Sequence, residues 1–135
     1  MNPIVRWFHQ LGSPPYFYWF AGRAMPWFYG AALPMLLWGV WTALYVVPVD
    51  YQQGDSYRIL FIHVPAAWMS LFIYFVMCVN AFIALVWRIK LSELLAMHSA
   101  PLGAAFTLLT LLTGSLWGKP MWGTWWTWDA RLTSE

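Results

Sequence analysis

The residues most able to do chemistry are concentrated near the end of the chain, where tryptophan is unusually dense. Residues 117–133 read WGKPMWGTWWTWDARLT and hold five of the twelve tryptophans, Trp117, Trp122, Trp125, Trp126 and Trp128. Tryptophan at this density is typical of two settings, a belt at the headgroup level of a membrane and a wall for a flat ligand. The tryptophans alone leave both interpretations open.

The spacing within this segment predicts part of its shape. Trp122, Trp125 and Trp126 stand at helical i, i+3 and i+4 positions, so we expect them on one face of a helix. Trp128 should diverge from that face. A turn is predicted before the helix by the residues that disfavour helical backbone, Gly118, Pro120 and Gly123.

A single histidine, His63, is the second candidate for chemistry. It lies in the stretch YRILFIHVPAAW, residues 57–68. Pro65 suits the first turn of a helix and biases Val64 away from helical geometry. We therefore expect His63 just outside that helix, at membrane-surface depth, with its ring on no helix face. The structural alternative is a histidine bonded to a backbone carbonyl or to water.

An imidazole beside a large aromatic surface meets two needs of haem, an axial nitrogen for iron and apolar walls for the porphyrin faces. Haem propionates also require cationic donors at the water edge. The cations expected there are Arg58, Lys119 and Arg131. Asp129 is expected to cap or brace the tryptophan segment through an indole N–H. These residues indicate a haem site, with an interfacial belt as the alternative.

Composition predicts that membrane helices carry these residues. The 135-residue chain is 61% hydrophobic and only 9% charged, which leaves too few polar residues to cover a soluble domain. Uncharged runs long enough to cross a bilayer lie at about residues 27–47, 66–87 and 101–117. We therefore predict an all-α integral membrane protein, with three transmembrane helices and a Trp-rich interfacial segment.

The segments that flank these spans have less definite roles. Residues 1–25 are expected to form an interfacial lead-in with no cleaved signal peptide, and residues 91–99 a short connector.

Cys78 is the single cysteine, so the chain has no internal disulfide and no Cys-x-x-Cys motif. Lysine and arginine are scattered singly, which argues against nucleic acid as a partner.

Charge bias predicts the orientation in the membrane. The chain has four cations on one side of the predicted spans and three on the other, Arg6, Arg23, Arg88 and Lys90 against Arg58, Lys119 and Arg131. This bias favours a cytoplasmic amino terminus, with residues 48–65 and 117–133 sharing the outer face. His9 and His98 then fall on the cytoplasmic side, outside the predicted site.

Residues 49–68, VDYQQGDSYRILFIHVPAAW, and the WWD signature within residues 117–133 resemble the haem-handling membrane proteins of cytochrome c biogenesis. Within that group the chain is similar to the cytochrome c maturation protein C family rather than to the longer haem-lyase subunit. The resemblance extends from about residue 27 onward. It implies a six-helix inner-membrane protein with a periplasmic WWD segment that holds haem between two periplasmic histidines. His63 matches the first histidine, and we expect the chain to be truncated before the second.

The resemblance also implies a delivery role rather than an enzymatic one. Haem b is then a non-covalent cargo, passed to the periplasmic haem chaperone of the pathway. The expected partners are the ATPase and membrane subunits of an ABC transporter, a small membrane protein and the lipid bilayer. The residues show no nucleophile with a base, no phosphate loop and no hydrolytic metal cluster.

Two other functions remain open on the residues alone. A membrane haem or quinone subunit for electron transfer would place paired histidines inside its helices, and the predicted spans contain none. A structural anchor would use the tryptophans only to dock lipid or a partner.

Overall fold

The computed structural model describes residues 2, 6, 10 and 12–134, except for the side chains of residues 131 and 132. The elements in chain order are α2 (Pro14–Trp41), the π-helical η1 (Thr42–Val46), the 3₁₀ helix η2 (Asp55–Ile59), α3 (Leu60–Trp87), α4 (Lys90–Trp122) and α5 (Ala130–Ser134). Three helical stretches in this described part are long and apolar enough to cross a membrane. The prediction of an all-α membrane protein is therefore confirmed.

The helices are longer than the predicted spans. α2 begins at Pro14 because Pro14 and Pro15 occupy its first turn, where the missing N–H of proline is not needed. Much of the expected interfacial lead-in therefore belongs to α2. Residues 91–99 belong to α4, which continues to Trp122, so the prediction of a separate connector there was wrong. An apolar environment favours continued helix, because every backbone group must be bonded within the chain.

Pro65 does not begin a helix. α3 starts at Leu60, directly after η2, so Pro65 lies in the second turn and His63 is part of the helix. The expectation that His63 lies outside the helix was therefore wrong. Proline at this position removes only the N–H that would bond to the Phe61 carbonyl, a loss that membrane helices tolerate.

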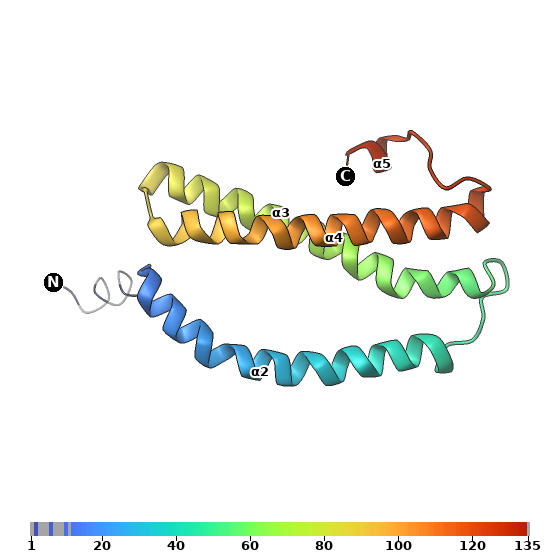
Figure 1. Cartoon of the computed structure of the whole chain (residues 1–135), viewed down its shortest axis with the longest axis horizontal. Helices are drawn as coiled ribbons and strands as arrows, with labels where there is room; N and C mark the ends of the chain where they lie inside the picture. Colours follow the sequence, from blue (N-terminus) through green and yellow to red (C-terminus); the bar gives the residue numbers. More distant parts are fainter. Residues whose placement is uncertain (1, 3–5, 7–9, 11, 135) are drawn as a thin grey trace.

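α3 and α4 form an antiparallel hairpin whose contact surface contains small residues. Figure 1 shows the two helices running back from the turn at residues 88–89. A Cβ added at Gly103 would stand 3.2 Å from Ile73 Cγ2, so the backbones approach closely there. Thr107 Oγ1 donates a hydrogen bond to Ser70 Oγ at 3.3 Å. Close packing and interhelical hydroxyl bonds are the main means of holding helices together in lipid.

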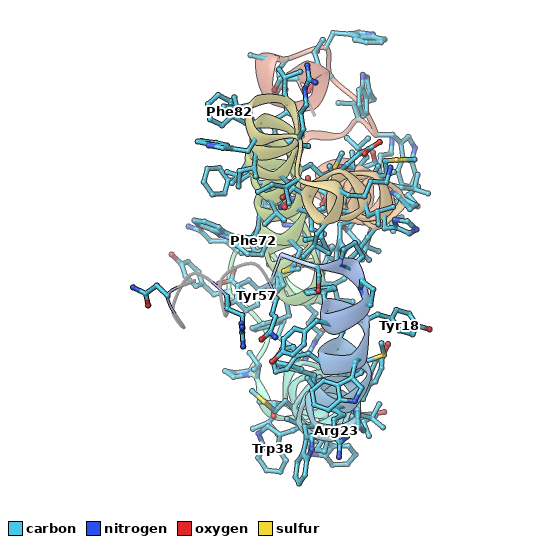
Figure 2. All side chains as sticks on the ribbon, turned by 90° about the vertical axis from the view of Figure 1, so that its left-hand side faces the viewer. Tyr18, Arg23, Trp38, Tyr57, Phe72 and Phe82 are labelled. Carbon is cyan, nitrogen blue, oxygen red and sulfur yellow. The ribbon has the colours of Figure 1, made fainter. Side chains whose placement is uncertain are left out.

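Polar and small residues lie inside the molecule, and large apolar residues lie outside. Figure 2 shows Tyr18, Trp38, Phe72 and Phe82 pointing away from the ribbon, and each is more than half exposed. The buried side chains include Ala66, Ser70, Ile73, Ser92, Thr110 and Thr113. This distribution suits lipid as the surrounding medium, because apolar side chains have no reason to avoid it.

Arg58 connects α2 to the hairpin. Its Nη1 donates hydrogen bonds to the carbonyls of Ala43 and Leu44, the second at 2.8 Å. These carbonyls lie in η1, at the carboxyl end of the first helical stretch, where the backbone ladder leaves acceptors without an intrahelical donor. The guanidinium therefore caps this end and draws η2 against it.

The two chemically distinctive segments lie at one end of the molecule. In Figure 1 the loop that follows η1 and the end of α4 lie together, opposite the turn at residues 88–89. Trp117 Nε1 donates to Gln53 Oε1 at 3.0 Å and fastens this loop to α4. The fold therefore brings the histidine-bearing end of α3 and the tryptophan segment to the same end.

Replacing Gly103 with Leu should destabilise the hairpin. The new side chain overlaps Ile73, and overpacking of this kind costs about 1–3 kcal/mol. We expect a lower thermal unfolding midpoint for the protein in detergent. Gly30→Leu in α2 is the matched control, since nothing lies within 4 Å of a Cβ at that position. An equal fall in both variants would contradict the packing described.

Candidate functional site

His63 lies at the contact between α3 and α4, with its ring against α4. Its Nδ1 is 3.0 Å from Thr113 Oγ1, and the residue is half-buried. A Cβ added at Gly114 would stand 3.1 Å from His63 Cε1, so the ring occupies space that a side chain would otherwise fill. The ring is therefore held on a helix face, contrary to the sequence-based expectation, because α3 begins earlier than predicted.

The glycine face of α4, formed by Gly114 and Gly118, connects the histidine to the tryptophans. The two glycines are four residues apart and so lie on the same side of the helix. A Cβ added at Gly118 would stand 3.3 Å from Trp122 Cε3. A shallow notch at this face is lined by Gly114, Gly118, Trp122, Thr124, Trp125, Trp126 and Thr127. His63 and the indoles thus border the same stretch of bare backbone.

The predicted helical face of tryptophans does not form. α4 ends at Trp122 and is capped by Gly123, whose φ of 77° is left-handed and whose N–H bonds to the Lys119 carbonyl at 3.0 Å. A glycine in this conformation is a common helix terminator, because it carries no Cβ. Trp125 and Trp126 follow in a non-helical stretch, so they do not share a helix with Trp122.

The turn predicted before the tryptophans forms only at Gly123. Gly118 and Pro120 remain within α4, where the prediction of a turn was wrong. Glycine is favoured where two segments approach closely in a membrane protein. Pro120 removes only one backbone donor near the end of the helix, so helical geometry continues through it.

The indole rings pack edge to face rather than as one flat sheet. The ring centroids of Trp117 and Trp122 are 5.0 Å apart with an interplanar angle of 78°. Those of Trp126 and Trp128 are 5.7 Å apart, also at 78°. Such pairs place the positive edge of one ring against the negative face of the other. A flat ligand would therefore meet individual ring faces.

One buried indole N–H near the notch has no hydrogen-bond partner. Trp126 Nε1 is the atom concerned, among the residues that the structure describes. The Thr124 hydroxyl donates to the Trp126 carbonyl at 3.0 Å and closes the turn that carries this ring. A buried donor without an acceptor costs about 1–3 kcal/mol. An oxygen acceptor on a ligand would relieve that cost.

The expected cations have contacts within the protein. Lys119 Nζ donates to the Gly123 carbonyl at 2.9 Å and lies 5.7 Å from the centroid of the Trp125 ring. Arg58 bonds to the η1 carbonyls. The side chain of Arg131 lies outside the described part of the chain. Their role toward propionates stays a prediction, as does the bracing role of Asp129.

The other histidines lie outside this site or outside the described residues. His98 is in α4, with Nδ1 2.7 Å from the Leu94 carbonyl, and His9 is not described. His63 and His98 are both helical, contrary to the expectation that the spans hold no histidine. Thr113, which contacts His63, is 15 residues from His98, or about 22 Å along the helix. The two histidines therefore do not form a ligand pair.

Thr113, Gly114 and Gln53 contribute to the site but were not predicted from the sequence. The spacing of Gly114 and Gly118 was a usable signal, since small residues one turn apart mark a close helix contact. No sequence pattern predicts the bond between Gln53 and Trp117, because it joins a loop to a distant helix.

Replacing Gly114 with Ala should move the His63 ring without unfolding the hairpin. The new methyl group would lie 3.1 Å from Cε1, so the ring must shift slightly. Alanine gains about 0.5–1 kcal/mol over glycine inside a helix. This gain offsets part of the clash, and we expect little change in the thermal unfolding midpoint.

The measurement is the NMR chemical shifts of the His63 ring. They should change in Gly114→Ala and stay constant in Gly39→Ala, where nothing lies within 4 Å of the added Cβ. Unchanged ring shifts in Gly114→Ala would show that His63 does not lie against this glycine.

Comparison with known proteins assigns this chain to a family. It matches the family model described as CcmC, heme exporter protein C, over residues 7–135. It is 54% identical over 127 residues to heme exporter protein C of Escherichia coli strain K12, covering 94% of this chain and 52% of that protein. For heme exporter protein C of Haemophilus influenzae the identity is 47% over 130 residues, covering 96% and 53%.

A third relative is a putative cytochrome c biosynthesis ccmC-like mitochondrial protein of Marchantia polymorpha. It is 53% identical over 95 residues, covering 70% of this chain and 42% of that protein. The chain spans about half the length of the curated relatives it matches. Because the family model covers nearly all of its residues, the chain belongs to the heme exporter protein C family.

Proposed function

We propose that the protein binds haem at the periplasmic face of the inner membrane and delivers it for cytochrome c-type biogenesis. The observation that carries this proposal is the shared position of His63 and the tryptophan segment. Both border the glycine face of α4, at one end of the hairpin. An imidazole nitrogen and aromatic walls at one membrane-level site suit an iron porphyrin better than any other common ligand.

The names of the relatives support the same function. Two of the relatives described above are named heme exporter protein C, and the third is named for cytochrome c biosynthesis. A protein that exports haem handles it as cargo, so we propose non-covalent haem b as the substrate rather than a resident cofactor. The role is transport-related, and no catalytic step is proposed.

The described residues fit this cargo. His63 is proposed as the axial ligand, and the indole faces at the end of α4 as the porphyrin walls. The wall residues are Trp117, Trp122, Trp125, Trp126 and Trp128. The N–H of Trp126 is a donor suited to a propionate oxygen, and Lys119 lies close to the same segment. We propose Arg58, Asp129 and Arg131 as further contacts at the water edge.

The proposed partners follow from delivery of a cargo across a membrane. They are the ATPase and membrane subunits of an ABC transporter, a small membrane protein, and the periplasmic haem chaperone that receives the haem. Three helices are long and apolar enough to cross a membrane, and we propose that each crosses once, so that the two ends of the described chain lie on opposite sides. We propose that the amino terminus is cytoplasmic and the tryptophan segment periplasmic.

Replacing His63 with Ala should remove most of the haem from the purified full-length protein. The proposed ligand nitrogen is lost, so the Soret absorbance per mole of protein should fall. His98→Ala is the matched control and should retain the wild-type band, because His98 lies toward the other end of α4.

Each other outcome has a definite meaning. Equal Soret bands in wild type and His63→Ala would remove His63 as a ligand. Loss of the band in both variants would show that the effect is not specific to His63 and would contradict its assignment as the ligand. A wild-type protein that carries no haem would favour a structural membrane anchor, whose tryptophans only dock lipid or a partner.

Single cysteines should report the orientation. In a Cys78→Ala background, Gln52→Cys and Thr127→Cys should react with a membrane-impermeant maleimide added to spheroplasts. Glu93→Cys, near the opposite end of the hairpin, should react only after the membrane is permeabilised. Reaction of positions 52 and 127 from opposite sides would refute a shared face, and reaction of position 93 from outside would reverse the orientation.

A further inference from the structure

We propose that Thr113 is a positioning residue that fixes the tautomer of His63. Its hydroxyl oxygen accepts a hydrogen bond from His63 Nδ1–H, so the other ring nitrogen, Nε2, keeps its lone pair for a metal. The tautomer follows from the structure alone. Its use in haem ligation rests on the proposed function.

The direction of the bond follows from the single proton of the threonine hydroxyl. Thr113 Oγ1 lies 2.7 Å from the Leu109 carbonyl oxygen and 3.2 Å from the Thr110 carbonyl oxygen. A carbonyl oxygen can only accept a hydrogen bond. Two oxygens at 2.7 Å repel each other unless a proton lies between them, so the hydroxyl proton points to Leu109.

The hydroxyl therefore has only lone pairs left for the histidine. His63 Nδ1 lies 3.0 Å from the same Oγ1, a normal hydrogen-bond length. Since Oγ1 accepts, Nδ1 must carry the hydrogen. In a neutral imidazole that assignment leaves Nε2 unprotonated. In the described part of the chain this is the hydrogen bond that the His63 ring makes, and it uses Nδ1.

Packing holds both partners of this bond in place. Thr113 is buried at the contact with α3, and its bond to Leu109 ties the hydroxyl to its own helix. Gly114 leaves only enough space for the edge of the imidazole. The ring therefore has a defined orientation as well as a defined tautomer before any ligand arrives.

Such an arrangement is what a metal-ligating histidine requires. Ligating histidines usually donate their other ring N–H to a nearby acceptor, which fixes the ring and raises the basicity of the ligating nitrogen. A more basic imidazole favours ferric over ferrous iron. Thr113 therefore acts on the haem iron through His63: its hydrogen bond favours the ferric state, although Thr113 does not contact the iron.

The first test needs no haem. The full-length apoprotein, labelled with ¹⁵N in its histidine rings, should show the Nδ1–H form for His63 in wild type and in Thr113→Ser. In Thr113→Val, which keeps the size of the side chain but removes the acceptor, this form should lose its dominance. His98 serves as an internal reference. A dominant Nε2–H form in wild type, or an unchanged tautomer in Thr113→Val, would overturn the proposal.

The second test uses the haem-loaded protein. Loss of a partner of this kind lowers metal affinity by about 10–100-fold. We expect Thr113→Val to bind ferric haem about tenfold more weakly relative to ferrous haem, which raises the one-electron reduction potential by about 59 mV. Thr113→Ser should restore the wild-type potential. Equal potentials in wild type and Thr113→Val would overturn the effect on iron.

The two proposals fail separately. If His63→Ala keeps its haem, the proposed ligand is wrong, whereas the apoprotein spectrum still decides the tautomer. If Thr113→Val does not fold, the wild-type and Thr113→Ser spectra still show which nitrogen carries the hydrogen.

Discussion

The close approach of α3 and α4 is the constraint on which the candidate site depends. Gly103 and Gly114 have no side chain at the contact, so the two backbones come near enough for His63 to reach Thr113. A bulky residue at Gly103 would meet Ile73, and one at Gly114 would displace the imidazole from its place beside Thr113. Small residues on α4 therefore decide both how the helices pack and where the histidine points.

The threonines of α4 make this contact polar without leaving donors unpaired. Thr110 and Thr113 donate to carbonyls one turn back, at 2.8 and 2.7 Å. Each hydroxyl is satisfied within its own helix, which matters because an unpaired hydroxyl in an apolar medium is costly. Its lone pairs remain directed outward as acceptors. A helix built in this way can stabilise a donor on its neighbour, and His63 supplies that donor.

Composition and motifs in the sequence were enough to predict the membrane helices and the family. The details of the site that depend on long-range packing between helices were not predicted. Hydropathy showed the membrane helices, and the WWD segment with the stretch around His63 showed the family. Pro65 predicts a helix start, because proline favours the first turn of a helix, but α3 begins at Leu60 and continues through Pro65, as lipid favours. The contact between His63 and Thr113 joins residues 50 apart, so it depends on how α3 and α4 are aligned, which no local pattern specifies.

The site combines a fixed nitrogen donor with less enclosed aromatic walls, and this contrast fits the proposed delivery of haem. The His63 ring is held by a hydrogen bond and by the glycine face. Three of the five indoles, by contrast, follow Gly123 outside any helix; Trp126 and Trp128 pack there as one nearly perpendicular pair, and Trp128 is 84% exposed. A protein that retains haem would enclose it, because burial slows release. A protein that passes haem on needs an axial ligand in a fixed position and an aromatic surface that is exposed on one side. This end of the hairpin has both.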